Sequence, residues 1–575
     1  MSINTWSLTR LILASSLLLL TGCQSPKPET QYEAVTSWCF DEGPIYTATD
    51  NAPLANAVAV KNGIITYVAH NQIKDGWCQT YAGPDAQRVK LTDHALYPGF
   101  TDAHAHLLGI GLRELTLNLE GTTSIANLKN KVQAALVNIG SNETLYGRGW
   151  IETHWPEKRF PNRYDLDEIA PDTPVILERA DGHALVVNSA ALKLAKIDEN
   201  TEIPFGGDIL KNDEGLVSGM LIDKAGQLVA DLMPRLTDER KLKAYIKGSE
   251  IYAQRGWTNM HSMSVDPADI RLLENLSISG AIDIRIYNSI DAKTASDVLT
   301  LSKKLPQTSL ITTKAIKLYS DGALGSRGAA LHVPYADDLK NDGLMLIKKE
   351  TIMPILRTAL QEGIQVNTHA IGDRANTELL NWYEEAYKEI TAEERAVSEP
   401  RWRIEHAQIL EIEDIERFGN LGVIPSMQPS HAIGDLHFAI ARLGPVRLKG
   451  GYAWRSLIDS GSIIAGGSDA PVEVGSPLIE FYAATVRKDL NGYNNKNWYP
   501  DEKVTPQEAL KMFTIWPAYA AFEDNKIGTI EVGKRADFTV FDTDIMTAKP
   551  EEILSANAVM TIVDGNLVFS KETAD

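Results

Sequence analysis

The chain has 575 residues, of which 44% are hydrophobic and 23% are charged, so it is long enough for a large core and at least one further domain. Its formal net charge of −20 argues against a nucleic-acid partner and favours an enzyme with a solvated acidic surface.

The first 23 residues resemble a bacterial lipoprotein signal peptide. Arg10 precedes the apolar run Leu11–Leu20, which is too short to span a bilayer comfortably. The run ends in Leu-Thr-Gly-Cys, and a polar stretch follows, so we expect Cys23 to be lipidated; an ordinary secretory signal is the alternative. By the same resemblance, Gln24 in place of an aspartate suggests the outer membrane. The expected location is the cell envelope, with a lipid anchor that faces the periplasm.

Two cysteines remain beyond Cys23, at positions 39 and 78. An exported compartment permits disulfides, and the number is even, so we expect a bridge between Cys39 and Cys78. Two free thiols are the alternative.

Both ends of the chain have strand patterns. Asn62-Gly63 separates the apolar runs 57–60 and 64–68, which is a hairpin signal. Similar runs occupy 536–541 and 559–563. Each end has too few strands for an independent sheet, so we expect 24–96 and 506–575 to form one composite β-sandwich.

The intervening segment, 97–505, alternates strand and helix patterns, which predicts a parallel α/β architecture. Eight apolar strands are expected at 97–103, 257–260, 282–287, 315–319, 364–368, 402–405, 423–427 and 463–465. Eight is the number that closes a (β/α)8 TIM barrel. A further apolar run, Val175–Leu177, is assigned to an insertion subdomain at about 120–240.

The expected strand ends carry side chains that bind metals. His104 and His106 are separated by one residue at the end of the first strand, so their side chains point the same way. Catalytic groups of a (β/α)8 barrel sit at the carboxyl ends of strands. Later strand ends supply four more candidates, namely Lys317, His369, His406 and Asp469. Imidazole and carboxylate groups in one barrel mouth indicate a metal site.

This order of residues resembles the amidohydrolase superfamily. The motif Pro-Gly-Phe-x-Asp-x-His-x-His is followed by the Lys, His, His and Asp positions above. Phrases that look like the amidohydrolase 3 branch, which includes N-substituted formamide deformylase, are Gly-Arg-Gly-Trp150, Asp181-Gly-His183, Asn188-Ser189, Ser320-Asp-Gly-Ala-Leu-Gly-Ser-Arg327, His369-Ala-Ile-Gly-Asp373 and Gly467-Ser-Asp-Ala-Pro-Val472. The similarity covers about residues 40–570.

The resemblance implies zinc or another divalent metal, as one or two ions. His104, His106 and Asp469 would bind the first ion, and His369 and His406 would bind the second. Lys317 would bridge them as a carbamate, because an ammonium has no lone pair to donate. In a one-metal site, Lys317 would instead form a salt bridge or contact substrate.

The implied reaction is hydrolysis of a non-peptide C–N bond in a small N-acyl or formamide-type amide. Metal-activated water would attack, with Asp469 as general base. A deaminase or cyclic-amide hydrolase on the same scaffold, and an inactive solute-binding lipoprotein, are the alternatives. The sequence leaves the oligomeric state open, with a homo-oligomer as one option.

Substrate contacts are expected from motif positions. The candidates for the pocket are Arg148, Trp150, His183, Arg327 and Gln428, with a structural role as the alternative for His183. His261 stands where the family often has a histidine before an aspartate, but Ser262 follows it here, which weakens a family role. His431 and His437 are expected on a surface loop.

Overall fold

Three β-sheets organise the part of the chain that the computed structural model describes, which is residues 36–571 without 138, 141–142, 153–154, 181, 183, 205–206, 305–306, 309 and 495–497. Within these residues, no helix is both long enough and apolar enough to cross a lipid bilayer. Cys23, the expected lipidation site, lies outside the described residues.

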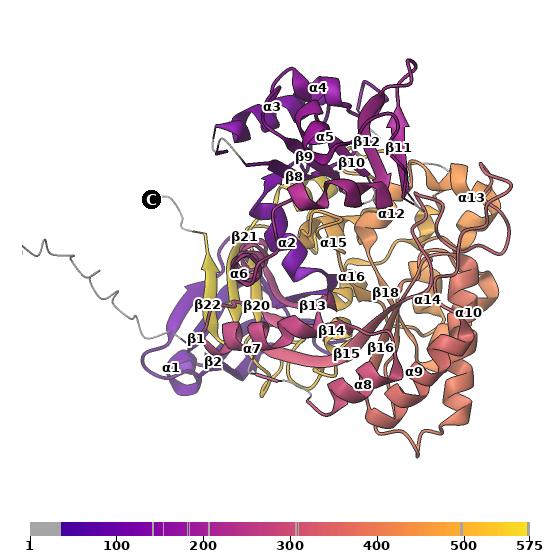
Figure 1. Cartoon of the computed structure of the whole chain (residues 1–575). Coiled ribbons are helices and arrows are strands. Elements are labelled where there is room, and N and C mark those ends of the chain that lie inside the picture. Colours follow the sequence, from indigo (N-terminus) through magenta and orange to yellow (C-terminus); the bar gives the residue numbers. More distant parts are fainter. Residues whose placement is uncertain are drawn as a thin grey trace, which may run out of the picture. The chain divides into compact units, whose positions relative to one another are not determined.

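Strands from both ends of the chain share one sheet, called sheet A below (Figure 1). Its order is β22 (Asn566–Ser570), β21 (Ala558–Val563), β20 (Phe538–Phe541), β5 (Ala95–Pro98), β1 (Trp38–Tyr46), β2 (Leu54–Lys61) and β3 (Ile64–Ala69), with β4 (Gln87–Lys90) paired to β1. β20 pairs with β5, and Phe40, Leu96 and Phe538 share one core. The prediction that the two ends of the chain form one domain together is therefore confirmed. Their strands belong to a single hydrogen-bonded sheet, in which β20 and β5 join the two ends.

The hairpin expected at Asn62-Gly63 joins β2 to β3. Both turn residues have positive φ, 51° for Asn62 and 76° for Gly63. A type I′ turn needs this conformation at both central positions, and asparagine and glycine adopt it most readily. The turn chemistry thus fixes the local pairing that the sequence predicts.

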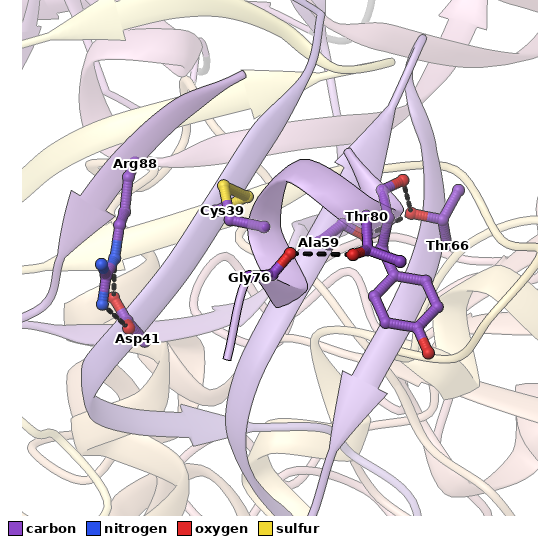
Figure 2. Close-up of a disulfide and its surroundings, with 9 residues drawn as sticks. Cys39, Asp41, Ala59, Thr66, Gly76, Thr80 and Arg88 are labelled. Atoms are coloured by element: carbon purple, nitrogen blue, oxygen red, sulfur yellow. Dashed lines mark hydrogen bonds and ion pairs between the residues drawn. A yellow bond between two sulfur atoms is a disulfide. The ribbon is translucent and has the colours of Figure 1, made fainter. Parts of the chain in front are cut away.

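A disulfide joins Cys39 of β1 to Cys78 of helix α1 (Trp77–Tyr81), the pair expected from the sequence. Figure 2 shows the bridge beside α1, where the Thr80 hydroxyl donates to the carbonyl oxygen of Gly76 at 2.9 Å. The two cysteines are buried, with exposed fractions of 0% and 7%. The bridge fastens α1 to the sheet through a covalent bond in addition to apolar contacts.

The second sheet is the barrel. Its eight parallel strands, in order, are β6 (Phe100–Ala105), β13 (Trp257–Val265), β14 (Arg285–Asp291), β15 (Ile311–Tyr319), β16 (Gln365–Ala370), β17 (Arg403–His406), β18 (Ile424–Met427) and β19 (Ala465–Gly466). After β19 the chain returns to the end of β6, where the Asp469 N–H donates to the His104 carbonyl oxygen at 2.6 Å. Each predicted barrel strand has a counterpart, and the predicted (β/α)8 fold is confirmed.

The first predicted strand, 97–103, is in fact two strands. Residues up to Pro98 belong to β5 of sheet A, and residues from Phe100 belong to β6 of the barrel. Gly99 makes the crossing, and a Cβ atom at this position would lie only 2.1 Å from Thr258 Oγ1. A continuous apolar run conceals this change of sheet, because both strands are buried.

The third sheet lies in the segment expected to be an insertion. Its order is β11 (Gly207–Lys211), β12 (Val217–Asp223), β10 (Ala184–Val187), β9 (Val175–Arg179), β8 (Leu145–Trp150) and β7 (Leu117–Asn118). Helices α3 (Ile125–Leu136), α4 (Arg163–Asp167) and α5 (Ser189–Ala195) accompany it. Two apolar clusters, one around Trp150 and one around Leu221, give this segment its own core.

Helices alternate with the barrel strands, as a (β/α)8 barrel requires. They include α2 (Leu107–Glu114), α6 (Asp238–Arg255), α7 (Ile270–Ile278), α8 (Ala295–Ser302), α9 (Lys349–Glu362), α10 (Asp373–Glu389), α11 (Ile415–Leu421), α12 (Pro429–Asp435), α13 (Ala439–Arg447), α14 (Trp454–Asp459) and α15 (Pro477–Val486). In α6 the Thr237 side chain caps the first turn, and Gly256 ends the helix with a φ of 98°.

The C-terminal segment contributes helices as well as strands. α16 (Pro506–Met512) and α17 (Ile515–Ala520) follow the barrel, and α18 (Pro550–Ser555) lies between β20 and β21. α17 packs against β6 and β19, and the Thr101 N–H donates to the Phe513 carbonyl oxygen at 2.7 Å. The first part of the segment 506–575 thus contacts the barrel, and the strands that it adds to sheet A begin at β20.

Candidate metal centre

The two histidines at the end of β6 have their Nδ1 atoms anchored. His104 Nδ1 lies 2.5 Å from Glu405 Oε2, and His106 Nδ1 lies 3.2 Å from the Met263 carbonyl oxygen. Because the Glu405 carboxylate accepts, His104 Nδ1 carries the proton and its Nε2 keeps its lone pair, whereas His106 has an acceptor at both nitrogens, since its Nε2 also lies within hydrogen-bond distance of Asp469 Oδ1. The two Nε2 atoms lie 3.4 and 3.0 Å from Asp469 Oδ1, so the predicted common orientation is present.

Asp469 lies on the loop that follows β19. Its φ of 61° is in the left-handed region, which is uncommon for a residue other than glycine. Burial would raise the pKa of its carboxyl, but His104, His106 and His406 outweigh burial and hold the pKa well below its usual value. The side chain is therefore a carboxylate at neutral pH.

Asp102 of β6 holds this loop in place. Its Oδ1 accepts from the Ser468 N–H at 2.9 Å, and its Oδ2 accepts from the Ser468 hydroxyl at 2.5 Å and from the Tyr252 hydroxyl at 2.9 Å. Burial raises the pKa of Asp102 to about 6, although these donors act in the other direction. Asp102 thus fixes the position of Asp469 relative to His104.

His406, at the end of β17, is held in the same manner as the β6 histidines. Its Nδ1 lies 2.8 Å from Gln428 Oε1, and Gln428 Nε2 donates to the Ser426 carbonyl oxygen at 3.2 Å. The second bond fixes which end of the amide faces His406, so Nδ1 donates and Nε2 is free to bind a metal.

His369, at the end of β16, has its ring 4.5 Å from the ring of His406. Its Nε2 has no hydrogen-bond partner within the described residues, and Asp321 Oδ1, 3.4 Å away, accepts from the Ile371 N–H at 3.0 Å. Burial, followed by the charge of Lys317, lowers the pKa of His369 to about 3. The ring is neutral near pH 7 and keeps a lone pair, as a ligand requires.

Lys317 extends from β15 into the same region. Its side chain is buried, with the residue 2% exposed, and Nζ lies 3.3 Å from His104 Nε2. Burial lowers the pKa of Lys317, although Glu405 and Asp469 act in the other direction. A lowered pKa increases the share of neutral amine, which is the form that can react with CO2.

The spacing of these donor atoms fits a metal ion. Two donors bonded to a tetrahedral zinc at 2.0–2.1 Å lie about 3.3 Å apart. The separations of Asp469 Oδ1 from the two β6 histidines are 3.4 and 3.0 Å. Within the described residues, His104, His106 and Asp469 form one group that could hold an ion, and His406, His431 and Asp469 form another.

The residues predicted to contact substrate lie in different surroundings. Trp150 is 0% exposed and packs in the core of the insertion, with its Nε1 bonded to Leu177, so it faces no pocket. Gln428 is buried and orients His406. Arg327 pairs with Asp337 at 3.0 Å, and Arg148 lies 3.8 Å from Glu178. His183 lies outside the described residues.

The sequence prediction missed two buried side chains at the site. His431 is not on a surface loop: it lies in the first turn of α12, and its side chain is 11% exposed. Glu405 is the second, since it accepts from His104 and pairs with Arg403 at 2.8 Å. The sequence contained a signal for each residue, since both lie close to a strand end where site residues are expected. Glu405 directly precedes His406, and His431 follows the end of β18 by four residues.

His261 also differs from a strand-end ligand. It lies inside β13, is 0% exposed, and its Nδ1 accepts from Arg403 Nη1 at 2.8 Å. His261 is therefore part of the packed interior of the barrel, where it accepts a hydrogen bond from Arg403.

A cavity of about 320 Å³ adjoins the centre. His106 forms part of its wall, together with apolar side chains that include Leu108, Leu112, Leu236 and Met263 and with the charged side chains of Lys241, Asp266 and Asp269. The cavity can hold a small molecule with an apolar substituent next to a metal ligand.

Comparison with known proteins identifies a family of hydrolases to which the sequence is similar. The model of the amidohydrolase family matches residues 88–569. The chain is 31% identical to putative amidohydrolase YtcJ of Bacillus subtilis over 92% of this chain and 98% of that protein. It is 28% identical to N-substituted formamide deformylase of Arthrobacter pascens over 90% of this chain and 95% of that protein.

A solved structure has the same fold. It is an uncharacterized metal-dependent hydrolase from Pyrococcus horikoshii, with a TM-score of 0.71 and 24% identity, and the match covers 90% of this chain and 99% of that one. With the family model matched across the whole barrel and the C-terminal strands of sheet A, the chain belongs to the amidohydrolase family.

Proposed function

We propose that the protein is a hydrolase that cleaves a non-peptide C–N bond in a small N-acyl or formamide-type amide, with zinc or another divalent metal. The observation that carries this proposal is the cluster of His104, His106 and Asp469, whose donor atoms are spaced as ligands of one ion. Two features support the substrate class: the cavity at His106, whose wall includes several leucine side chains, and the likeness to a protein named for formamide deformylation.

The bound metal would act as a Lewis acid that lowers the pKa of water and polarises the substrate carbonyl. His104, His106 and Asp469 would hold it, and their second partners keep the ligand atoms in place. Glu405 fixes the tautomer of His104, the Met263 carbonyl holds the ring of His106, and Asp102 fixes the loop that carries Asp469. Such outer partners make a site rigid before substrate arrives.

Asp469 would be the general base. Its carboxylate is ionised and only 10% exposed. Oδ1 faces the histidines of β6, and Oδ2 faces His431. It can take the proton from the attacking water at Oδ1 or Oδ2 and then deliver that proton to the leaving nitrogen. The amine would depart neutral, and the carboxylate would be regenerated.

Lys317 would act as a carbamate ligand in a two-metal site. This proposal is supported by the burial of its side chain and by the separation of 3.3 Å between Nζ and His104 Nε2. Carbamylation replaces the cationic head with an anionic oxygen donor, which removes an unfavourable charge from beside the histidines.

The test combines metal removal with a substrate panel. Chelated protein is reconstituted with zinc or manganese and assayed on N-formyl amines, N-acyl amines, lactams and aminated heterocycles. We expect turnover of N-formyl or N-acyl amines that chelation removes and metal restores. Turnover of only lactams or heterocycles would favour the alternative reactions, and no metal in freshly purified protein would favour the solute-binding alternative.

A further inference from the structure

The cavity beside His106 borders the metal centre at two points. The first is His106 itself, which lines the cavity and has its Nε2 3.0 Å from Asp469 Oδ1. The second is Ser264, which also lines the cavity and whose hydroxyl is hydrogen-bonded to the Tyr319 hydroxyl. The ring of Tyr319 lies 5.2 Å from Lys317 Nζ. A substrate whose carbonyl group lies at the centre can therefore extend another part of the molecule into this cavity.

One part of the cavity wall is apolar. Leu108 and Leu112 both line the cavity, and because they are four residues apart on α2 their side chains lie on the same face of the helix. Leu236, which is 47% exposed, and Met263 complete this part of the wall. Each methylene group that leaves water for such a wall strengthens binding about fourfold. The wall thus suits an alkyl chain.

The ammonium group in the wall is already engaged by a carboxylate of the protein. Lys241 and Tyr245 are four residues apart on α6, and both contact Asp269. Lys241 Nζ lies 2.6 Å from Asp269 Oδ1, and the Tyr245 hydroxyl donates to Asp269 Oδ2 at 3.0 Å. The hydrogen bond to Asp269 raises the pKa of Lys241, so the side chain remains an ammonium. Its charge is balanced within the protein and does not require an anionic ligand.

A second carboxylate makes the wall negative. Asp266 lines the cavity, and its Oδ1 accepts from the Ala268 N–H at 2.9 Å. Lys241 is thus accompanied by two carboxylates, those of Asp266 and Asp269. An anionic group of a substrate would lose water here and would meet like charges, both of which weaken its binding.

We propose that this cavity binds the substituent on the nitrogen of the scissile amide and selects an uncharged alkyl chain. Leu108, Leu112 and Leu236 contact the chain, while Asp266 and Asp269 disfavour an anionic group. In a formamide the carbonyl carbon carries only hydrogen, so the substituent on nitrogen is the part that needs a cavity. The substrates are therefore neutral N-alkyl amides rather than N-acyl amino acids. This inference rests on the amide hydrolysis proposed above.

The main test compares substrates that differ in one terminal group. Zinc-loaded wild type is assayed on N-formylmethylamine, on N-formylhexylamine, and on two analogues of N-formylhexylamine in which the terminal methyl group is replaced by a carboxylate or by an ammonium group. We expect kcat/KM to be highest for N-formylhexylamine, lower for the ammonium analogue and lowest for the carboxylate analogue. The carboxylate analogue should be at least about tenfold below N-formylhexylamine.

Two variants test the apolar wall. Leu112→Trp fills part of the cavity, so the ratio of kcat/KM for N-formylhexylamine to that for N-formylmethylamine should fall at least about tenfold, through KM for the longer substrate. Leu115→Trp, at a position that is 41% exposed and outside the lining, is the control. Leu236→Asp at the exposed rim should move the preference from N-formylhexylamine toward the ammonium analogue. Leu242→Asp, 37% exposed on α6 and outside the lining, is its control. Circular dichroism checks the fold of each variant.

A third variant tests the charge of the wall. Asp266→Asn keeps an acceptor for the Ala268 N–H and removes one negative charge. The disadvantage of the carboxylate analogue relative to N-formylhexylamine should then shrink at least about threefold. Asp213→Asn, at an exposed position between β11 and β12, should leave that ratio as in wild type.

The outcomes separate this inference from the proposed hydrolysis. Turnover with similar kcat/KM for N-formylhexylamine and its two analogues would leave amide hydrolysis in place and overturn the selection by the cavity, as would equal ratios in the cavity variants and their controls. If no compound is turned over, the proposed hydrolysis fails. Binding to the metal-free protein, measured by saturation-transfer NMR, then decides about the cavity. Binding of N-formylhexylamine that Leu112→Trp weakens and Leu115→Trp does not would support it, and absence of binding would overturn it.

Discussion

Glu405 Oε2 lies 2.5 Å from His104 Nδ1, and both side chains are 0% exposed. Arg403 Nε lies 2.8 Å from Glu405 Oε1 and balances its charge. The carboxylate therefore fixes the tautomer of a metal ligand and is itself fixed by an arginine of the same strand.

Removal of the Glu405 charge should weaken metal binding. In Glu405→Gln an acceptor for His104 remains, but the ligand becomes less basic and Arg403 is left buried without a counter-charge. We expect a 10- to 100-fold loss of affinity for the tighter ion, of the order found for outer partners of metal ligands, and a lower Tm. Isothermal titration with Zn²⁺ measures the affinity. Glu416→Gln, at an exposed position of α11, is the control, and equal affinities in both variants would refute this role.

Asp469→Asn should abolish turnover while the fold is kept. The amide cannot accept the proton of the attacking water, so we expect a fall in kcat of at least about 10²–10⁴. Because Asp469 belongs to both ligand groups, metal content should fall as well. Asp459→Asn, whose side chain is 68% exposed, should behave like wild type. Activity near that of wild type in Asp469→Asn would show that another group takes the proton.

The stability of the protein should depend on pH through Asp435. Burial raises the pKa of Asp435 to about 7, although the hydrogen bond from Tyr452 opposes this. The folded pKa is above the unfolded value, so the contribution of Asp435 to stability is greatest at low pH and falls as pH rises from about 4 to 7. The loss is at most about 1.4 kcal/mol per pH unit, and partial exposure reduces it.

Asp435→Asn removes this titration and keeps an acceptor for Tyr452. Relative to wild type, its Tm should therefore increase between pH 5 and pH 8. Thermal melts of both proteins, and of Asp501→Asn at an exposed position, provide the comparison. A difference in Tm that is the same at both pH values would show that Asp435 does not titrate in this range.

The Cys39–Cys78 bridge can be checked by counting thiols. A chain that begins at residue 24 should show no reactive thiol when denatured without reductant and two after reduction. The bridge closes a loop with a sequence separation of 39, so the double variant Cys39→Ala, Cys78→Ala should lose about 2–5 kcal/mol. Two thiols before reduction would mean that the cysteines are free in solution.

We propose that Cys23 anchors the protein to the outer membrane, and fractionation of cells tests this. Wild type should sediment with outer membranes, Cys23→Ser should be released, and Gln24→Asp should move to the inner membrane. Mass spectrometry of the N-terminal peptide should find a lipid on Cys23. A Cys23→Ser protein that still sediments would indicate another means of attachment.

The sequence predicts the barrel well for a physical reason. Buried parallel strands are short apolar runs, and functional side chains follow their carboxyl ends, so the ends at His104, His369 and His406 mark strands and site together. The change of sheet at Gly99 is not predictable in the same way. It depends on the close approach of Thr258, which is distant in sequence.

The site residues that prediction missed, or placed wrongly, depend on packing between elements. His431 reaches Asp469 because α12 begins directly after β18. Trp150 has the motif position of a pocket residue but packs inside the insertion. Gln428 lies near the centre, and only its bond to His406 shows that it orients a ligand.

The strand order of sheet A has a consequence for the order of events during folding. β20 is the neighbour of β5, but the two strands are more than 400 residues apart in the sequence. The edge of β5 that pairs with β20 therefore has no native partner until the residues up to 541 are available to fold. A free edge invites pairing with other chains, so this edge is open to such pairing in any folding intermediate in which β20 has not yet docked. A shortened chain that ends before β20 should accordingly aggregate, even with every barrel strand and metal ligand present.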